Sequence, residues 1–150
     1  MDWNAIFGAM NLLAMLSWAA LILGPRKPLL LSSLLYLGVG MMCFVYAAGL
    51  IAIVTGLVDP VGGEAQASFS TIEGVRAIFA SDGGITIGWT HYLAFDLFVG
   101  IWVARDADAK NFSRFLQAPI LLAIFFAGPL GLLLWLLIRE GRARAQGRWQ

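Results

Sequence analysis

The sequence predicts an all-α integral membrane protein, a bundle of four transmembrane helices with one short amphipathic helix at the membrane interface. Of its 150 residues, 60% are apolar and only 13% are charged, whereas soluble domains carry about 25% charged residues. A chain with so few polar groups cannot cover its own surface with them, so lipid is its natural solvent. The length fits a single domain over residues 1–150.

Four apolar segments are long enough to cross the hydrocarbon core of a bilayer, which takes about 20 helical residues. They cover residues 5–24, 29–58, 85–104 and 115–138. The second segment exceeds the core thickness, so its helix has to tilt, kink or emerge, and Gly38, Gly40 and Gly49 are expected bending or close-packing points. Pro119 and Pro129 are expected to kink the fourth segment, because proline removes a backbone donor.

The longest polar stretch separates the second and third segments. Residues 59–63 contain turn sequences. Ser70 and Glu73 fit a capping box with Ser70 as N-cap, and apolar residues follow at helical spacing. We therefore expect an amphipathic helix over about 71–80 that lies along the interface and ends at the glycines of 82–84.

The positive-inside rule leaves the orientation undecided if all four segments cross the membrane. The N-terminus, the 59–83 loop and the tail then share one side, and the two short loops share the other. Each side carries five basic residues: Arg76, Arg139, Arg142, Arg144 and Arg148 on one, and Arg26, Lys27, Arg105, Lys110 and Arg114 on the other. The charged connection 105–111 is expected to be solvated, and the tail from Arg139 to lie among the headgroups.

Two ionisable residues, His91 and Asp96, lie within the third segment. Such groups are costly inside a bilayer and usually face the bundle interior, so both are candidate catalytic residues. Because Asp96 follows His91 by five positions, the two side chains lie about 140° apart around a helix. They can therefore border one cavity only from two sides. An aromatic lining next to them suits an extended, unsaturated or ring-bearing lipid, and the candidate binding residues are Trp89, Tyr92, Phe98 and Trp102.

Other interpretations of these residues remain open. His91 and Asp96 can serve as polar groups that hydrogen-bond between helices, and Trp89 and Trp102 can anchor the segment at the two interfaces. A zinc site needs several His or Cys ligands, and only His91 and Cys43 are available. No cofactor is therefore expected, although a single axial haem ligand at His91 stays possible, as does a short proton path through His91 and Asp96. A net charge of +1 gives no reason to expect nucleic acid as a partner.

The stretch Trp89-Thr-His-Tyr-Leu-Ala-Phe-Asp-Leu-Phe98 resembles the neoxanthin-synthase-like membrane family, which is named for abscisic-acid-deficient plants. The pattern is W-x-H-x-L-x-x-D-L-F on a spanning helix, and residues 78–81 and 128–131 support it. The resemblance is best over residues 72–138. Because the first apolar segment begins within a few residues of Met1, we expect a bacterial member located in the inner membrane.

The resemblance implies a role in carotenoid and xanthophyll metabolism. In plants the family is tied to the formation of neoxanthin from violaxanthin, which opens an epoxide, leaves an allene and needs no redox cofactor. The resemblance thus implies an isomerase, with Asp96 as the acid and His91 as the base, or the reverse. The alternative is a non-enzymatic subunit that binds a carotenoid-like pigment or supports a membrane complex, together with lipid, a second copy or another membrane protein.

Overall fold

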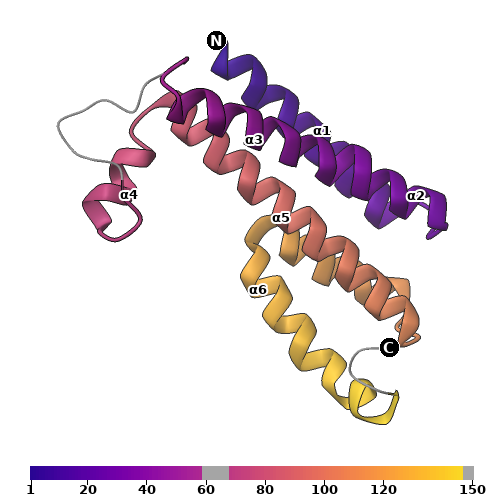
Figure 1. Ribbon diagram of the computed structural model, residues 1–150. Helices are drawn as coiled ribbons and strands as arrows, with labels where there is room; N and C mark the ends of the chain where they lie inside the picture. Colours follow the sequence, from indigo (N-terminus) through magenta and orange to yellow (C-terminus); the bar gives the residue numbers. More distant parts are fainter. Residues whose placement is uncertain (59–67, 147–150) are drawn as a thin grey trace.

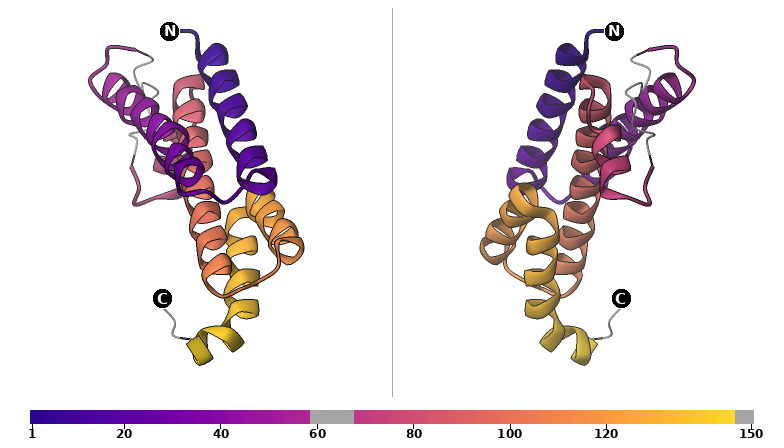
Figure 2. Two further views of the ribbon diagram at one scale, coloured as in Figure 1. Left: turned by 90° about the vertical axis from the view of Figure 1, so that its right-hand side faces the viewer. Right: turned by 90° about the vertical axis from the view of Figure 1, so that its left-hand side faces the viewer.

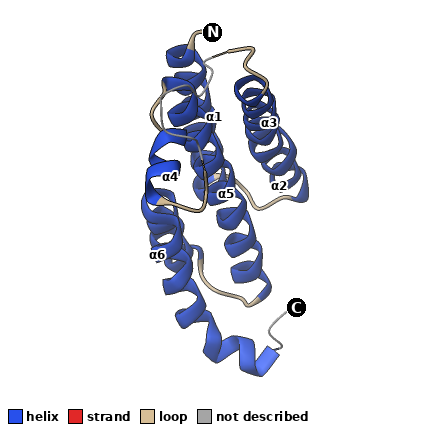
Figure 3. Ribbon diagram, turned by 60° about the vertical axis from the view of Figure 1, so that its left-hand side comes forward, coloured by secondary structure: helices blue, strands red, loops and turns tan. Residues whose placement is uncertain are grey.

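In the computed structural model, residues 1–58 and 68–146 are described, and every regular element among them is a helix (Figure 3). The elements are α1 (Trp3–Leu23), α2 (Pro28–Ser33), the π-helical η1 (Leu34–Val39), α3 (Gly40–Val54), α4 (Ile72–Ile78), α5 (Asp82–Ala109) and α6 (Arg114–Gln146). The elements α2, η1 and α3 form one continuous helix, so the described part contains four helices long and apolar enough to cross a membrane. The predicted all-α fold with four such helices is confirmed.

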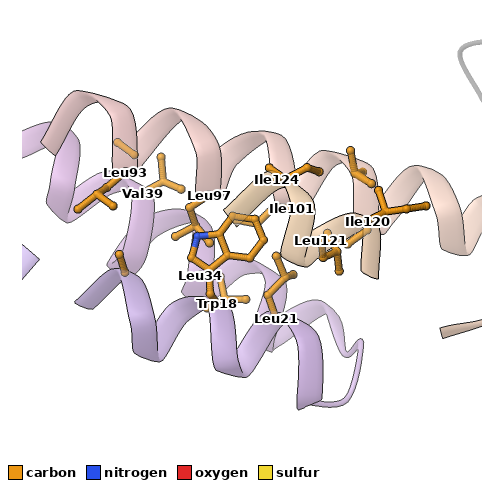
Figure 4. Close-up of a cluster of buried hydrophobic side chains, with 14 of the residues drawn as sticks. Trp18, Leu21, Leu34, Val39, Leu93, Leu97, Ile101, Ile120, Leu121 and Ile124 are labelled. Carbon is orange, nitrogen blue, oxygen red and sulfur yellow. The ribbon is translucent and has the colours of Figure 1, made fainter. Parts of the chain in front are cut away.

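Helix α5 is the centre of the bundle, with α1, α3 and α6 packed around it (Figures 1 and 2). Half of its apolar stretch is buried, against 28% to 33% in the other three long helices. Trp18 of α1, Ile101 of α5 and Ile124 of α6 meet in the core (Figure 4). A Cβ atom on Gly100 would overlap the Trp18 ring, so this glycine allows the indole to pack directly on the α5 backbone.

The second long helix covers residues 28–54 and ends four residues before the predicted bound. The Thr55 hydroxyl donates to the Ile51 carbonyl oxygen at 2.7 Å, and Gly56 follows with a φ of 72°. A residue in this left-handed conformation cannot continue a right-handed helix, which is why the helix stops although its sequence remains apolar.

Two of the glycines expected at close-packing points are in such positions. A Cβ atom on Gly38 would lie 3.0 Å from the Ser17 hydroxyl oxygen, and one on Gly49 would overlap the Ile87 side chain. The absence of a side chain at Gly38 and Gly49 therefore brings the second long helix close to α1 and α5, in agreement with the prediction.

Helix α6 folds back on itself, so that its two arms lie next to each other (Figures 1 and 2). The backbone is non-helical at Ala127 (φ −154°, ψ 72°), two residues before Pro129. A Cβ atom on Gly131 would overlap the backbone nitrogen of Ile124, which shows how closely the arms approach. We call residues 114–126 the first arm and residues 128–146 the second arm. A kink was predicted, but the reversal was not.

The charged segment after the third apolar stretch is not the solvated connection that was predicted. Helix α5 continues to Ala109, and both Asp106 and Lys110 have almost fully buried side chains. The Asp106 carboxylate accepts hydrogen bonds from Lys110 Nζ at 2.9 Å, from Arg139 Nε at 2.6 Å and from Trp135 Nε1 at 3.0 Å. Because the second arm returns to this end of α5, it supplies two of these three donors, and we call the four residues the Asp106 cluster.

The same end of the molecule holds a second, more exposed ion pair. Asp108 lies 3.5 Å from Arg26 and also accepts from Gln117 Nε2 at 2.8 Å. Burial lowers the pKa of the Arg26 guanidinium from its ordinary value, while the Asp108 carboxylate opposes that change. The loop before α2 is thereby tied to the ends of α5 and α6.

A short helix is present in the predicted place as α4, with a different cap from the one predicted. Thr71, not Ser70, is the N-cap, and its hydroxyl accepts from the Gly74 backbone N–H at 3.1 Å. Ser81 caps α5 in the same way through Gly84, so residues 82–84 start α5 instead of forming a terminating turn. The predicted turn at residues 59–63 lies outside the described residues.

Candidate functional site

His91 lies on the exposed side of α5, between two aromatic rings. Its imidazole stacks on Phe95 with ring centroids 4.6 Å apart and lies 5.2 Å from the Tyr46 ring of α3. The imidazole borders an apolar groove of about 460 Å³ between α3, α4 and α5, which we call the His91 groove. Aliphatic and aromatic side chains form most of its walls, among them Leu50, Ile53, Phe69, Phe79 and Ile87.

A second apolar groove, the Tyr92 groove, adjoins the first and has a volume of about 360 Å³. Its lining consists of Phe7, Phe79, Ile85, Gly88, Trp89 and Tyr92, and it shares Phe79 and Gly88 with the His91 groove. Gly88 lies one helical turn before both His91 and Tyr92. A ligand in the His91 groove therefore reaches the imidazole, and a ligand in the adjoining Tyr92 groove reaches the phenol.

Gly88 is required for this arrangement, because a Cβ atom there would overlap the Phe79 ring. Phe79 is the C-cap residue of α4 and about half exposed. Helix α4 thus contributes one aromatic wall to both grooves, and it does so by resting on the bare backbone of α5. Sequence reasoning missed both residues as functional candidates, although Phe79 lies in the stretch 78–81 that supported the family resemblance.

Asp96 faces α6 instead of the His91 groove. Asp96 is 9% exposed, and its Oδ2 atom is buried without a hydrogen-bond partner among the described residues. The carboxyl group interacts with the Tyr92 hydroxyl one turn earlier, and that hydroxyl also interacts with the Gly128 backbone. A Cβ atom on Gly128 would overlap the Asp96 carboxylate. The fold-back of α6 therefore places its tip directly against Asp96.

The two candidate catalytic residues therefore have separate surroundings, and Tyr92 is the residue between them. Tyr92 lines its groove and contacts Asp96, while the neighbouring His91 lines the other groove. Trp89 stacks on Tyr92 at 5.2 Å, and its Nε1 donates to Asn11 Oδ1 at 3.1 Å. Trp89 and Tyr92 are thus placed where a groove ligand would contact them.

The other two predicted binding residues lie elsewhere. Phe98 is 50% exposed and lines neither groove. Trp102 is partly buried under the Arg139 guanidinium, whose carbon lies 5.6 Å from the ring centroid, at the Asp106 end of α5. Helical spacing places both residues on the same faces of α5 as the site. The two grooves cover only part of the length of those faces.

Fold and site together define an integral membrane protein with a central helix, two adjoining apolar grooves and one buried carboxyl group in mid-helix. The chain belongs to the ABA DEFICIENT 4-like family, whose family model matches residues 5–135. The match confirms the predicted family and extends through the first two long helices. No curated protein and no solved structure matches the chain significantly. Family membership points to a membrane protein related to carotenoids and xanthophylls.

Proposed function

We propose that the protein holds the end ring of a xanthophyll-like polyene in the two adjoining grooves, next to the Phe79 ring that covers Gly88, and isomerises it by proton transfer. The observation that supports this most directly is the pair of adjoining apolar grooves with one proton-exchanging group on each side, His91 and Tyr92. Apolar concave sites with a few convergent polar groups are the usual form of lipid and cofactor pockets.

The proposed reaction is the opening of an epoxide without a redox change. The acid gives a proton to the epoxide oxygen, and the C–O bond breaks with its electron pair passing to that oxygen, which becomes a hydroxyl group. The base removes a proton from the adjacent polyene chain, and the electron pair of that C–H bond forms the additional double bond of an allene. Asp96 serves as the acid through the Tyr92 hydroxyl, and His91 serves as the base; the reverse assignment uses the same two grooves.

The test is pigment conversion by cells that produce the protein together with an epoxy-xanthophyll. We expect His91→Ala and Asp96→Asn each to lower conversion by about 100-fold or more, the usual contribution of a general acid or base. Phe98→Leu is the matched control on the same helix and should leave conversion unchanged. Conversion at the parent rate in both site variants, at equal protein levels, would contradict the proposed catalysis.

A second candidate function is non-catalytic pigment binding within a membrane complex, with a second copy or another membrane protein as partner. It is favoured by the contact between Asp96 and the α6 tip, because a carboxyl group that supports a broken helix already has a structural role. This function predicts a purified protein that carries pigment, visible by its absorbance, both before and after the His91→Ala and Asp96→Asn changes. A Soret band lost with His91→Ala would instead indicate haem.

A further inference from the structure

The fold-back of α6 brings three chain segments together at one end of the molecule. Arg142 Nη1 of the second arm donates to the carbonyl oxygens of Lys110 and Asn111, at 3.0 and 2.7 Å. Arg114 Nη2 donates to the Gly24 carbonyl oxygen at 2.7 Å. The loop after α1, the loop after α5 and the end of α6 therefore share a face, opposite to the N-terminus and α4 (Figure 1).

The charges of the described residues separate along the same axis. The shared face has eight cations and three carboxylates, a net charge of +5: Arg26, Lys27, Arg105, Lys110, Arg114, Arg139, Arg142 and Arg144 with Asp106, Asp108 and Glu140. The opposite end has one cation and three carboxylates, a net side-chain charge of −2: Arg76 with Asp2, Glu73 and Asp82. Four crossings would have put five basic residues on each side of the membrane, because the tail from Arg139 would then lie on the same side as α4. In the structure, the described part of that tail lies at the opposite end from α4.

The length of the first arm fits a segment that enters a membrane without crossing it. Its 13 residues (114–126) extend about 20 Å, less than the roughly 30 Å core. Its tip reaches Asp96, the fifteenth of the 28 residues of α5, and so lies near mid-depth. Non-helical backbone at that depth is tolerated where protein buries it or where it lines a water-filled cavity. The non-helical Ala127 is partly buried, and the next residue, Gly128, is buried against Asp96.

We propose that α6 is a re-entrant hairpin and that the cationic face it completes binds anionic lipid headgroups of the cytoplasmic leaflet. Eight cations against one give the positive-inside rule a clear direction, with the N-terminus and α4 on the far side. Lys27 and Arg105 have exposed side chains without an ion pair in the described part of the chain, so they are the groups available to phosphate. This inference does not depend on the proposed reaction.

Cysteine labelling tests the topology. In a Cys43→Ala background, Ser70→Cys reports on the α4 end, while Ser113→Cys and Ala145→Cys report on the two ends of the hairpin. With a membrane-impermeant maleimide on intact cells, we expect labelling at 70 alone, and at 113 and 145 only after permeabilisation. Labelling at both 70 and 145 in intact cells would show that α6 crosses the membrane. Labelling at 113 and 145 but not at 70 would show the opposite orientation. Either result overturns the proposal.

Lipid selectivity tests the headgroup contact with the purified full-length protein. The protein is given phosphatidylglycerol and phosphatidylcholine vesicles together. The measured quantity is the preference for phosphatidylglycerol over phosphatidylcholine among the lipids bound around the protein. We expect the double change Lys27→Gln, Arg105→Gln to reduce the preference for phosphatidylglycerol by about 25-fold at low salt, since each cation contributes about fivefold at an anionic surface. Arg76→Gln, at the other end, should leave the preference intact. Equal losses in both variants, or no preference in the parent protein, would overturn the proposal.

Discussion

Two aspartates on the same helix, ten residues apart, lie in opposite kinds of surroundings. Asp106 accepts hydrogen bonds from Lys110, Arg139 and Trp135, so its negative charge is matched by two buried cations. Asp96 has no cation next to it, and its Oδ2 atom is buried without a partner in the part of the chain that the structure describes. Its contacts are a phenol and the backbone tip of α6.

The difference fits a structural role for Asp106 and the chemical role proposed for Asp96. A carboxylate whose oxygens are all occupied by cations fixes the position of the groups around it, here the second arm of α6. A carboxyl group with an oxygen that lacks a partner, held next to a hydroxyl that lines a groove, fits the proton transfer proposed above. The Asp106 cluster thus positions the hairpin, and the hairpin in turn positions Gly128 against Asp96.

The largest expected effect is the difference in stability between variants that lack the charge of Asp106 and variants that lack the charge of Asp96. Asp106→Asn removes the charge of the carboxylate that Lys110 and Arg139 both contact in the buried Asp106 cluster, so we expect it to lower the free energy of unfolding by about 3–5 kcal/mol. Asp96→Asn keeps the shape and removes no ion pair, so a loss of less than about 1 kcal/mol is expected. Equilibrium unfolding in mixed detergent micelles measures both variants. Equal losses for the two would show that the distinction between the aspartates is wrong.

A smaller effect is expected where the hairpin touches Asp96. Gly128→Ala places a methyl group against the carboxylate, and we expect a loss of about 1–3 kcal/mol from overpacking. In an Asp96→Ala background the same change should cost less than about 1 kcal/mol, because the obstructing group is gone. Gly8→Ala is the control, since nothing lies within 4 Å of a Cβ atom there. An unchanged cost in the Asp96→Ala background would place the tip of α6 away from Asp96.

Much of the fold could be predicted because the hydropathy of a segment shows by itself whether that segment prefers lipid or water. Each apolar segment indicates a helix whatever its neighbours do, and two ionisable groups in the third segment indicate a site on that helix. The reversal of α6 could not be predicted in this way. Pro129 indicates a break but not its direction, and the direction depends on Arg139 meeting Asp106, 33 residues earlier in the chain.

Only the part of the candidate site that lies on α5 could be predicted from the sequence. The faces of His91 and Asp96 follow from helical spacing, and so does the proximity of Tyr92 to Asp96. The groove walls come from other elements, Phe79 of α4 and Tyr46 of α3, whose positions depend on packing. The cap of α4 shows the same limit at short range. Ser70 and Thr71 both have a hydroxyl group, and the backbone path decides which one caps the helix.

The smallest expected effect concerns an arginine on the second arm that lies five residues beyond Arg139. Arg144 pairs with Glu140 at 2.9 Å, but its side chain is 72% exposed, whereas the Arg139 side chain is 8% exposed. We expect Arg144→Gln to lower the free energy of unfolding by about 0.3–0.5 kcal/mol, and about 1 M salt to abolish that difference by screening. Arg139→Gln should cost several times more and keep most of its effect in salt, because water and ions do not reach the Asp106 cluster. A loss for Arg144→Gln as large as that for Arg139→Gln would mean that the last turns of α6 are buried in the membrane protein as it exists, against a partner or a second copy.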